Sequence, residues 1–326
     1  MCRHWEPCTT TIALDLRTTV ELSRYTREKI LVESSAFGTE EATPPTLPLS
    51  GPLGLIFAVV GYFGVHGLRV VIEATAPVRS GMGGSGTATV ATIGALAKLL
   101  ARAGGRDYDR REIVLLAHHL EDSLHANTGL QDQASATYGG VHLWRWNYSD
   151  RLDFDVDSLL VDPAELESHV LAAYSGKPHT GNRSGSVLER FKRTGDLEKM
   201  RQISLHARRL GEAIRDHDYR AAGRALFEEF EVRSEMMDQI VPDEDRMLVT
   251  SARDLGCGVR FAGRGGGGSI WAIGEADAIT SLSAEWTSIL SRREAGFVFP
   301  RRIAREGLHV TEPTRLQAGS GTLKPR

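Results

Sequence analysis

The stretch "APVRSGMGGSGTATV", residues 76–90, holds four glycines and two serines between Ser80 and Thr87 and then continues into apolar sequence. Residues 68–78, "LRVVIEATAPV", are rich in β-branched side chains and predict a strand. Residues 87–105, "TATVATIGALAKLLARAGG", predict a helix that is buried on most sides and stops at a glycine pair. The glycine loop therefore joins a strand to a helix.

A strand, a glycine-rich turn and a helix in this order can form an anion site. The helix N-terminus presents unpaired N–H groups and the positive end of the helix dipole. Glycines let the backbone fold into a concave nest without a Cβ in the way. Ser80, Ser85 and Thr87 add hydroxyls for phosphate oxygens or a bound Mg²⁺. The alternative is a plain tight turn, because glycine is common in turns that bind nothing.

Two common phosphate-binding signatures do not describe this loop. The P-loop pattern G-x-x-x-x-G-K-[ST] is absent from the sequence. Gly81, Gly83 and Gly86 fit G-x-G-x-x-G, but no acidic residue follows a second strand about 20 positions later, as a dinucleotide site requires. The loop alone therefore leaves its ligand open.

The composition is that of a globular protein. The chain has 326 residues, of which 41% are hydrophobic and 25% charged, and its net charge is −3. This charge gives no attraction to nucleic acid or to a membrane. Three scattered cysteines make neither a disulfide framework nor a zinc cluster, and we expect a cytoplasmic protein. No apolar run is long enough to span a bilayer, and the sequence gives no oligomeric state.

The pattern along the chain predicts an α+β protein of two domains, 1–157 and 158–326. The segment 51–68 is a buried helix or a strand pair, and 131–150 runs from a small-residue turn into a strand. From about residue 158 the chain is mainly helical. The remaining predicted elements are strands in 9–23, 28–35, 257–263 and 270–274, a helix over 109–124, and a second glycine run at 264–269.

Five segments together resemble the GHMP kinase superfamily, which includes galactokinase and the homoserine, mevalonate and phosphomevalonate kinases. "PVRSGMGGSGTA" resembles its phosphate loop and "GVRFAGRGGGGS" its third motif. "GLQDQASATYGGV" resembles the segment with the catalytic aspartate in the sugar-1-kinase branch, and "AYSGKPHTG" and "REGLHV" are similar to that branch too. The resemblance runs from about Thr9 to Val310 and is strongest to heptose 7-phosphate kinases and fucokinases.

The resemblance implies a fold and an activity. The fold is the two-domain GHMP kinase fold, with a ribosomal protein S5 domain 2-like N-terminal domain and a ferredoxin-like C-terminal domain. The activity is an ATP- and Mg²⁺-dependent phosphorylation of the anomeric hydroxyl of a heptose 7-phosphate or a related sugar. The implied partner is thus a sugar or sugar-phosphate substrate, with neither nucleic acid nor membrane involved.

The resemblance also implies the residues that bind ATP and the metal. Ser85 and Glu121 would hold Mg²⁺, with Asp122 as a rival ligand on the same turn as Glu121. The alternatives are a helix N-cap role for Ser85 and a solvated helix charge for Glu121. The phosphates of ATP would lie on Ser80, Gly81, Met82, Gly83, Gly84, Ser85, Gly86 and Thr87.

Asp132, between two glutamines, matches the catalytic aspartate of the superfamily. It would accept the proton of the attacking hydroxyl or orient that hydroxyl. The alternative is an aspartate in a turn or at a helix N-cap. His118 and His119 are adjacent and point to different helix faces, so we interpret them as ordinary helix residues and not as zinc ligands.

The loop after residue 174 is basic and rich in glycine, so it could bind a substrate phosphate; solvated loop charges are the alternative. The second glycine run is expected to allow a close backbone approach to the phosphate loop, with Arg264 facing either a phosphate or solvent. The predicted substrate-side residues are Lys177, His179, Thr180, Arg183, Gly265 and Gly266.

One departure from the superfamily gives two rival hypotheses. The family opens with a segment similar to R-A-P-x-R-I-S-x-x-G-G-G-T-D, and this chain has "MCRHWEPC" there. A chain that lacks this motif would have an incomplete sugar pocket and could be a catalytically weak nucleotide-binding protein. A third hypothesis is a GHMP kinase for an alcohol that is not a sugar, such as homoserine or phosphomevalonate.

Overall fold

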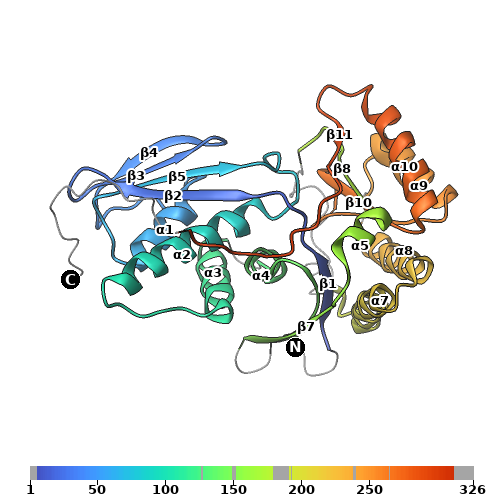
Figure 1. Cartoon of the computed structure of the whole chain (residues 1–326), viewed down its shortest axis with the longest axis horizontal. Helices are drawn as coiled ribbons and strands as arrows, with labels where there is room; N and C mark the ends of the chain where they lie inside the picture. The colour runs from blue at the N-terminus through green and yellow to red at the C-terminus, as the bar shows by residue number, and fades with distance from the viewer. Residues whose placement is uncertain are drawn as a thin grey trace. The chain divides into compact units, whose positions relative to one another are not determined.

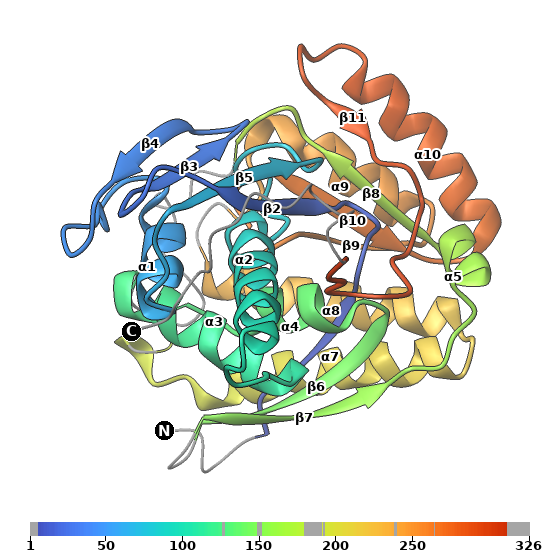
Figure 2. The same cartoon turned by 60° about the vertical axis from the view of Figure 1, so that its left-hand side comes forward.

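The structure is a computed structural model that describes residues 6–125, 128–148, 152–178, 191, 193–237, 240–263 and 265–311 (Figures 1 and 2). The chain forms two compact units, each built from three stretches of sequence. Unit 1 contains Met1–Asp15, Pro77–Gly83 and Gly139–Arg305, and unit 2 contains Leu16–Ala76, Gly84–Tyr138 and Glu306–Arg326. These bounds do not follow chain order, and the sequence division at residue 157 stays a prediction.

Unit 2 is a mixed sheet with helices on one face, as Figure 1 shows. The strand order is β2-β5-β3-β4, in which β5 is parallel to β3 and the other pairs are antiparallel. The strands are β2 (Thr18–Arg24), β3 (Ile30–Ser34), β4 (Gly38–Ala42) and β5 (Leu68–Ala74). The helices are α1 (Gly54–Tyr62), α2 (Gly84–Arg102), α3 (Arg110–Leu124) and α4 (Gln131–Tyr138).

Alternation along β5 explains why this sheet has one covered face. Leu68, Val70 and Ile72 are buried in the core shared with α1, α2 and α3, and the residues between them are more exposed. This period of two places alternate side chains on opposite faces. The segment expected as a helix or a strand pair is helix α1, in which residues 54–57, 59 and 60 are buried and therefore cover more than one face.

Unit 1 contains two antiparallel sheets in its described part. One has the order β1-β6-β7 and the other β11-β8-β10-β9. Their strands are β1 (Cys8–Ile12), β6 (Val141–Asn147), β7 (Asp153–Ser158), β8 (Val170–Tyr174), β9 (Gly258–Phe261), β10 (Ser269–Ile273) and β11 (Phe297–Val298). The helices are α5 (Pro163–His169), α7 (Leu197–Arg215), α8 (Tyr219–Met236), the short η2 (Asp243–Asp245), α9 (Arg246–Asp254) and α10 (Ala276–Leu290).

The described part of unit 1 has two buried clusters of apolar side chains, and each cluster joins strands to helices. Alternate residues of β8, β9 and β10 share a buried cluster with α9 and α10, around the fully buried Trp286. The Trp286 indole N–H donates to the carbonyl of Leu248 at 3.0 Å, which joins α10 to α9. A second cluster joins β1 and β6 to the apolar faces of α7 and α8. Among the described helices of both units, none is long and apolar enough to cross a membrane.

Two elements differ from the sequence expectation. Residues 131–138 form helix α4 where a turn was expected, and residues 170–174 form strand β8 inside a stretch expected to be mainly helical. Strand β8 is buried along its whole length, so its sequence lacks the polar alternation that marks a half-exposed strand. Helix α4 has almost no apolar stripe, and it forms against α2 and α3.

The buried thiol of Cys257 gives a prediction for high pH. Burial raises the pKa of this thiol to about 11, whereas an unfolded cysteine ionises near pH 8.5. A raised pKa contributes stability that is present below the unfolded value and is lost as the pH rises through the folded value. The loss amounts to about 3 kcal/mol. The free energy of unfolding, measured with urea at pH 8 and pH 10.5, should therefore fall more for the native chain than for Cys257→Ala. An equal fall in both proteins would contradict this prediction.

Candidate active site

The N-terminus of α2 in unit 2 is open and carries two hydroxyls with defined contacts. A Cβ built at Gly84 would meet nothing within 4 Å. The Ser85 Oγ donates to Oε1 of Glu121 at 2.8 Å, so this hydroxyl is paired with a carboxylate. The Thr87 Oγ1 donates to the carbonyl of Gly84 and lies 2.8 Å from Oγ1 of Thr18, which fixes the first turn of α2 to β2. The first N–H groups of this 19-residue helix thus lie at an uncovered helix N-terminus, where the unpaired N–H groups and the helix dipole favour an anion.

The Glu121 side chain makes hydrogen bonds that connect three helices. It lies on α3, accepts from Ser85 of α2 through Oε1, and accepts from the Gln133 side chain of α4 through Oε2. Two oxygens at right angles on one Mg²⁺, each at about 2.0–2.1 Å, lie about 3 Å apart. The 2.8 Å between the Ser85 and Glu121 oxygens fits that requirement. Hydroxyl and carboxylate oxygens are also the donors that Mg²⁺ takes.

The other candidate ligands on α3 have different surroundings. Oδ1 of Asp122 accepts from the backbone N–H of Thr128 at 3.1 Å and so caps the next loop. His118 is buried, and burial lowers the pKa of its imidazole, while its neighbour His119 is exposed. Within the described ranges, no group of three or more His, Cys, Asp or Glu side chains could hold a metal. A Mg²⁺ held by few protein oxygens and mostly by phosphate and water needs no such group.

Asp132 lies in the first turn of α4 and is exposed. Its backbone packs on α2 at Gly86, where an added Cβ would lie 3.2 Å from the Asp132 Cβ and 3.4 Å from the Gln133 nitrogen. The predicted catalytic carboxylate is therefore beside the N-terminus of α2. Asp132 occupies a helix and not the turn that its flanking residues suggested.

Gly86 gives a prediction about this close approach. Gly86→Ala is expected to push α4 away from α2, because the tight contact is with the Asp132 Cβ and backbone. A displacement of this kind can cost about 10²-fold in rate. The overpacking cost of about 1–3 kcal/mol is partly offset by a gain of about 1 kcal/mol for alanine in a helix. Rate and melting temperature measured together should show a large loss of the first and a small loss of the second.

Gly129→Ala is the matched control for that experiment. An added Cβ at Gly129 meets nothing within 4 Å, and this glycine does not have a positive φ. A similar rate loss in both variants would contradict the role given to the contact at Gly86.

The segment Pro77–Gly83 in unit 1 is anchored by backbone contacts. Ser80 is buried, and its carbonyl accepts from the Ser269 N–H at 2.6 Å. Gly81 has φ +77°, and an added Cβ there would lie 3.5 Å from the Ala262 carbonyl. An added Cβ at Gly263 would lie 3.3 Å from the Gly81 carbonyl. The two glycine-containing segments therefore touch at Gly81 and Gly263, where any larger residue would be strained.

The glycine run itself contacts other backbone. Gly265 to Gly268 all have positive φ. The Gly268 N–H donates to the Lys177 carbonyl at 3.1 Å, and the Gly266 N–H donates to the Ile240 carbonyl at 3.1 Å. The run was expected to approach the phosphate loop. The approach is made instead by Gly263 and Ser269, which flank the run.

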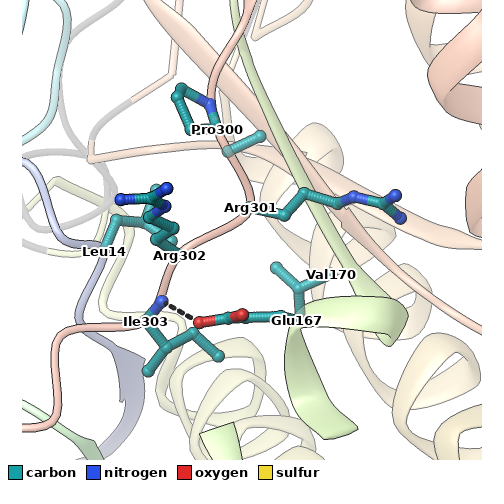
Figure 3. A pocket seen from close by; sticks show the side chains of 8 residues that line it. Leu14, Glu167, Val170, Pro300, Arg301, Arg302 and Ile303 are labelled. Carbon is teal, nitrogen blue, oxygen red and sulfur yellow. Dashed lines mark hydrogen bonds between the residues drawn. The ribbon is translucent and has the colours of Figure 1, made fainter. Parts of the chain in front are cut away.

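The predicted substrate-side residues are only partly described. Lys177 is exposed and its Nζ pairs with Glu244, while Gly265 and Gly266 have the contacts given above. His179, Thr180, Arg183 and Arg264 lie outside the described residues. None of the predicted site residues lines the shallow pocket of unit 1 in Figure 3. There Glu167 accepts from the Ile303 N–H at 2.8 Å, and the two neighbouring arginines point apart.

Comparisons with known proteins agree with this architecture. The family model of the GHMP kinases N terminal domain matches residues 54–140, the region of α1 to α4. The chain is 29% identical to a mevalonate kinase from Methanothermobacter thermautotrophicus over 85% of this chain and 88% of that protein.

Solved structures share the fold. A D-glycero-D-manno-heptose 1-phosphate kinase from Bacteriodes thetaiotaomicron superposes with a TM-score of 0.72 at 18% identity, over 95% of this chain and 93% of that chain. A mevalonate kinase from Methanococcus jannaschii superposes with a TM-score of 0.67 at 16% identity, over 90% of each chain.

Residues 54–140 therefore match the N-terminal domain of the GHMP kinases, and the chain has the two-domain α+β fold of that superfamily, as the sequence motifs predicted. It is a kinase, a phosphotransferase that acts on an alcohol group.

Proposed function

We propose that the protein transfers the γ-phosphoryl group of ATP, with Mg²⁺, to the anomeric hydroxyl of a heptose 7-phosphate or a related sugar. The observation that carries the proposal is the arrangement around α2, where the Ser85–Glu121 pair and Asp132 meet one helix N-terminus. The buried free thiols of Cys8 and Cys257 support the cytoplasmic location that we propose with it.

Each part of this arrangement has a defined task in phosphoryl transfer. The backbone from Gly81 to Thr87 would bind the phosphates, because the glycines leave its N–H groups accessible and the α2 dipole favours negative charge. Ser85 and Glu121 would hold Mg²⁺, which neutralises charge on the phosphate oxygens when bound. Asp132 would accept the proton of the acceptor hydroxyl or orient that hydroxyl for attack.

The acceptor is the finer part of the proposal. The context "GLQDQ" around Asp132 favours a sugar. The curated relatives favour a second candidate, mevalonate or another alcohol that is not a sugar, because several of them are mevalonate kinases. The third candidate is a nucleotide-binding protein with weak catalysis.

The experiment is ADP release from Mg²⁺-ATP with a panel of acceptors. The panel holds heptose 7-phosphates, fucose, galactose, mannose, mevalonate, phosphomevalonate and homoserine. Turnover with a heptose 7-phosphate or a related sugar is the expected result. Turnover with mevalonate alone would replace the sugar with the second candidate. ATP binding without turnover across the panel would favour the third candidate.

A further inference from the structure

Gln133 is a buried residue that the roles proposed above do not use. Its side chain is 1% exposed and lies on α4 immediately after Asp132. The side-chain Nε2 donates to Oε2 of Glu121. The side-chain Oε1 is buried and has no hydrogen-bond partner among the residues that the structure describes. One end of the amide is therefore paired and the other is not.

The orientation of this amide follows from its neighbour. An ionised carboxylate only accepts hydrogen bonds, so the NH₂ group of Gln133 must face Glu121. The carbonyl oxygen is then left without a hydrogen-bond partner, which costs about 1–3 kcal/mol. A leucine or methionine would fill the same space without this cost. The buried side-chain carbonyl of Gln133 thus lacks a hydrogen-bond donor. Gln133 is also the residue that contacts the proposed metal ligand Glu121.

The donor that fits is a water molecule bound to Mg²⁺. Mg²⁺ keeps several of its waters when protein carboxylates and phosphates bind it. Residues that orient metal ligands by hydrogen bonds commonly change metal affinity about 10–100-fold when replaced. We propose that Gln133 is a positioning residue for the metal, which orients Glu121 through Nε2 and accepts a hydrogen bond from a Mg²⁺-bound water through Oε1. This inference rests on the proposed function.

The proposal also links metal binding to Asp132. Gln133 and Asp132 are consecutive residues of α4, and Gln133 is joined to Glu121 of α3. A metal that fixes Gln133 would thereby fix the backbone that carries Asp132. The proposed metal ligand and the proposed base are thus connected through a single buried side chain.

The experiment measures metal binding directly. Mn²⁺, a probe for the Mg²⁺ position, is titrated into the full chain with a non-hydrolysable ATP analogue and followed by electron paramagnetic resonance. Gln133→Met has a similar volume and lacks both polar atoms. We expect its Mn²⁺ affinity to be about 10–100-fold weaker than that of the native chain. Without metal, its melting temperature should stay close to the native value, because the lost bond to Glu121 is offset by removal of the unpaired carbonyl.

One control and a second Gln133 variant make each outcome decisive. Ser135→Ala, on the same helix, should bind Mn²⁺ like the native chain. Gln133→Leu is the second variant if the methionine variant does not fold, with the same expected result. Equal Mn²⁺ affinity in the native and Gln133 variants would overturn this inference and leave the proposed function standing. If the native chain binds neither nucleotide analogue nor Mn²⁺, the proposed function and the inference both fail.

Discussion

Replacing Asp132 with asparagine is expected to lower the rate of acceptor phosphorylation by about 10²–10⁴-fold, the usual contribution of a positioned proton acceptor. Asparagine keeps the shape of the side chain but cannot take the proton of the attacking hydroxyl. The first turn of α4 loses a helix-dipole interaction of about 0.3–1 kcal/mol, which is small beside the stability of a domain, so the variant should remain folded. Acceptor-dependent ADP release, measured beside nucleotide binding, should show catalysis lost and binding retained.

Asp122→Asn is the matched control for Asp132→Asn. Asp122 is an exposed carboxylate whose contact is with the Thr128 backbone. Its replacement should change the rate by less than about twofold, since the asparagine Oδ1 can still accept from Thr128 and only an exposed charge is lost. A rate loss confined to Asp122→Asn would assign the essential carboxylate to Asp122 and remove Asp132 from the mechanism.

Glu229→Gln is expected to destabilise the protein by about 3–5 kcal/mol, the typical cost of leaving buried charges without their partner. Glu229 is 3% exposed, and its Oε1 accepts from Arg233 and, at 2.9 Å, from Arg260. Burial would raise the pKa of the Glu229 carboxyl, but the two guanidinium groups outweigh it and hold this pKa below its usual range. Burial also lowers the pKa of Arg260 to about 10.

The pH dependence of this effect has a definite sign. A carboxyl with a depressed pKa contributes stability above its unfolded value near pH 4.3, and that stability is lost as the pH falls through the folded value. Urea unfolding should therefore show the largest difference between the native chain and Glu229→Gln at neutral pH, and a smaller one below about pH 4. Glu228→Gln is the control, because its side chain is 48% exposed and a surface pair contributes about 0–1 kcal/mol. A loss of the same size in both variants would contradict the role given to burial.

The same cluster has a link to the glycine segments of unit 1. The Arg260 guanidinium donates to the Gly263 carbonyl at 3.3 Å, and Gly263 is the glycine that packs against Gly81. The charge cluster therefore stabilises the turn on which the segment Pro77–Gly83 rests.

The sequence predicted the elements whose signals are local. Helix α2 was expected over 87–105 and is found at Gly84–Arg102, because apolar periodicity and the following glycines mark a helix and its end. Helix α3 was expected over 109–124 and begins at Arg110, after the capping box that joins Asp109 and Glu112. The order of the glycine motifs correctly predicted the fold and the match of residues 54–140 to the GHMP kinases N terminal domain.

The sequence could not predict what depends on distant contacts. Helix α4 has two turns and few apolar residues, and α2 and α3 stabilise it from positions about 20 to 40 residues earlier. The pairing of Glu121 with Ser85 and Gln133 joins three helices, so no spacing along one helix reveals it. Gln133 had a weak signal in the motif "QDQ", but only burial and the unpaired Oε1 distinguish it from Gln131.

The interleaved composition of the two units determines the order in which a growing chain can complete them. Strand β1, near the start, pairs with β6, so this pairing must wait until residue 147 has left the ribosome. When the chain has been synthesised as far as Tyr138, unit 2 already has its sheet and helices α1 to α4. The segment that starts at Glu306 is still missing at that stage. That segment donates the Leu308 N–H to the Thr137 carbonyl and places the Leu308 side chain against Gly94. Contacts between residues this far apart in sequence slow folding, so a segment that follows all of unit 1 in the sequence completes the unit that could start first.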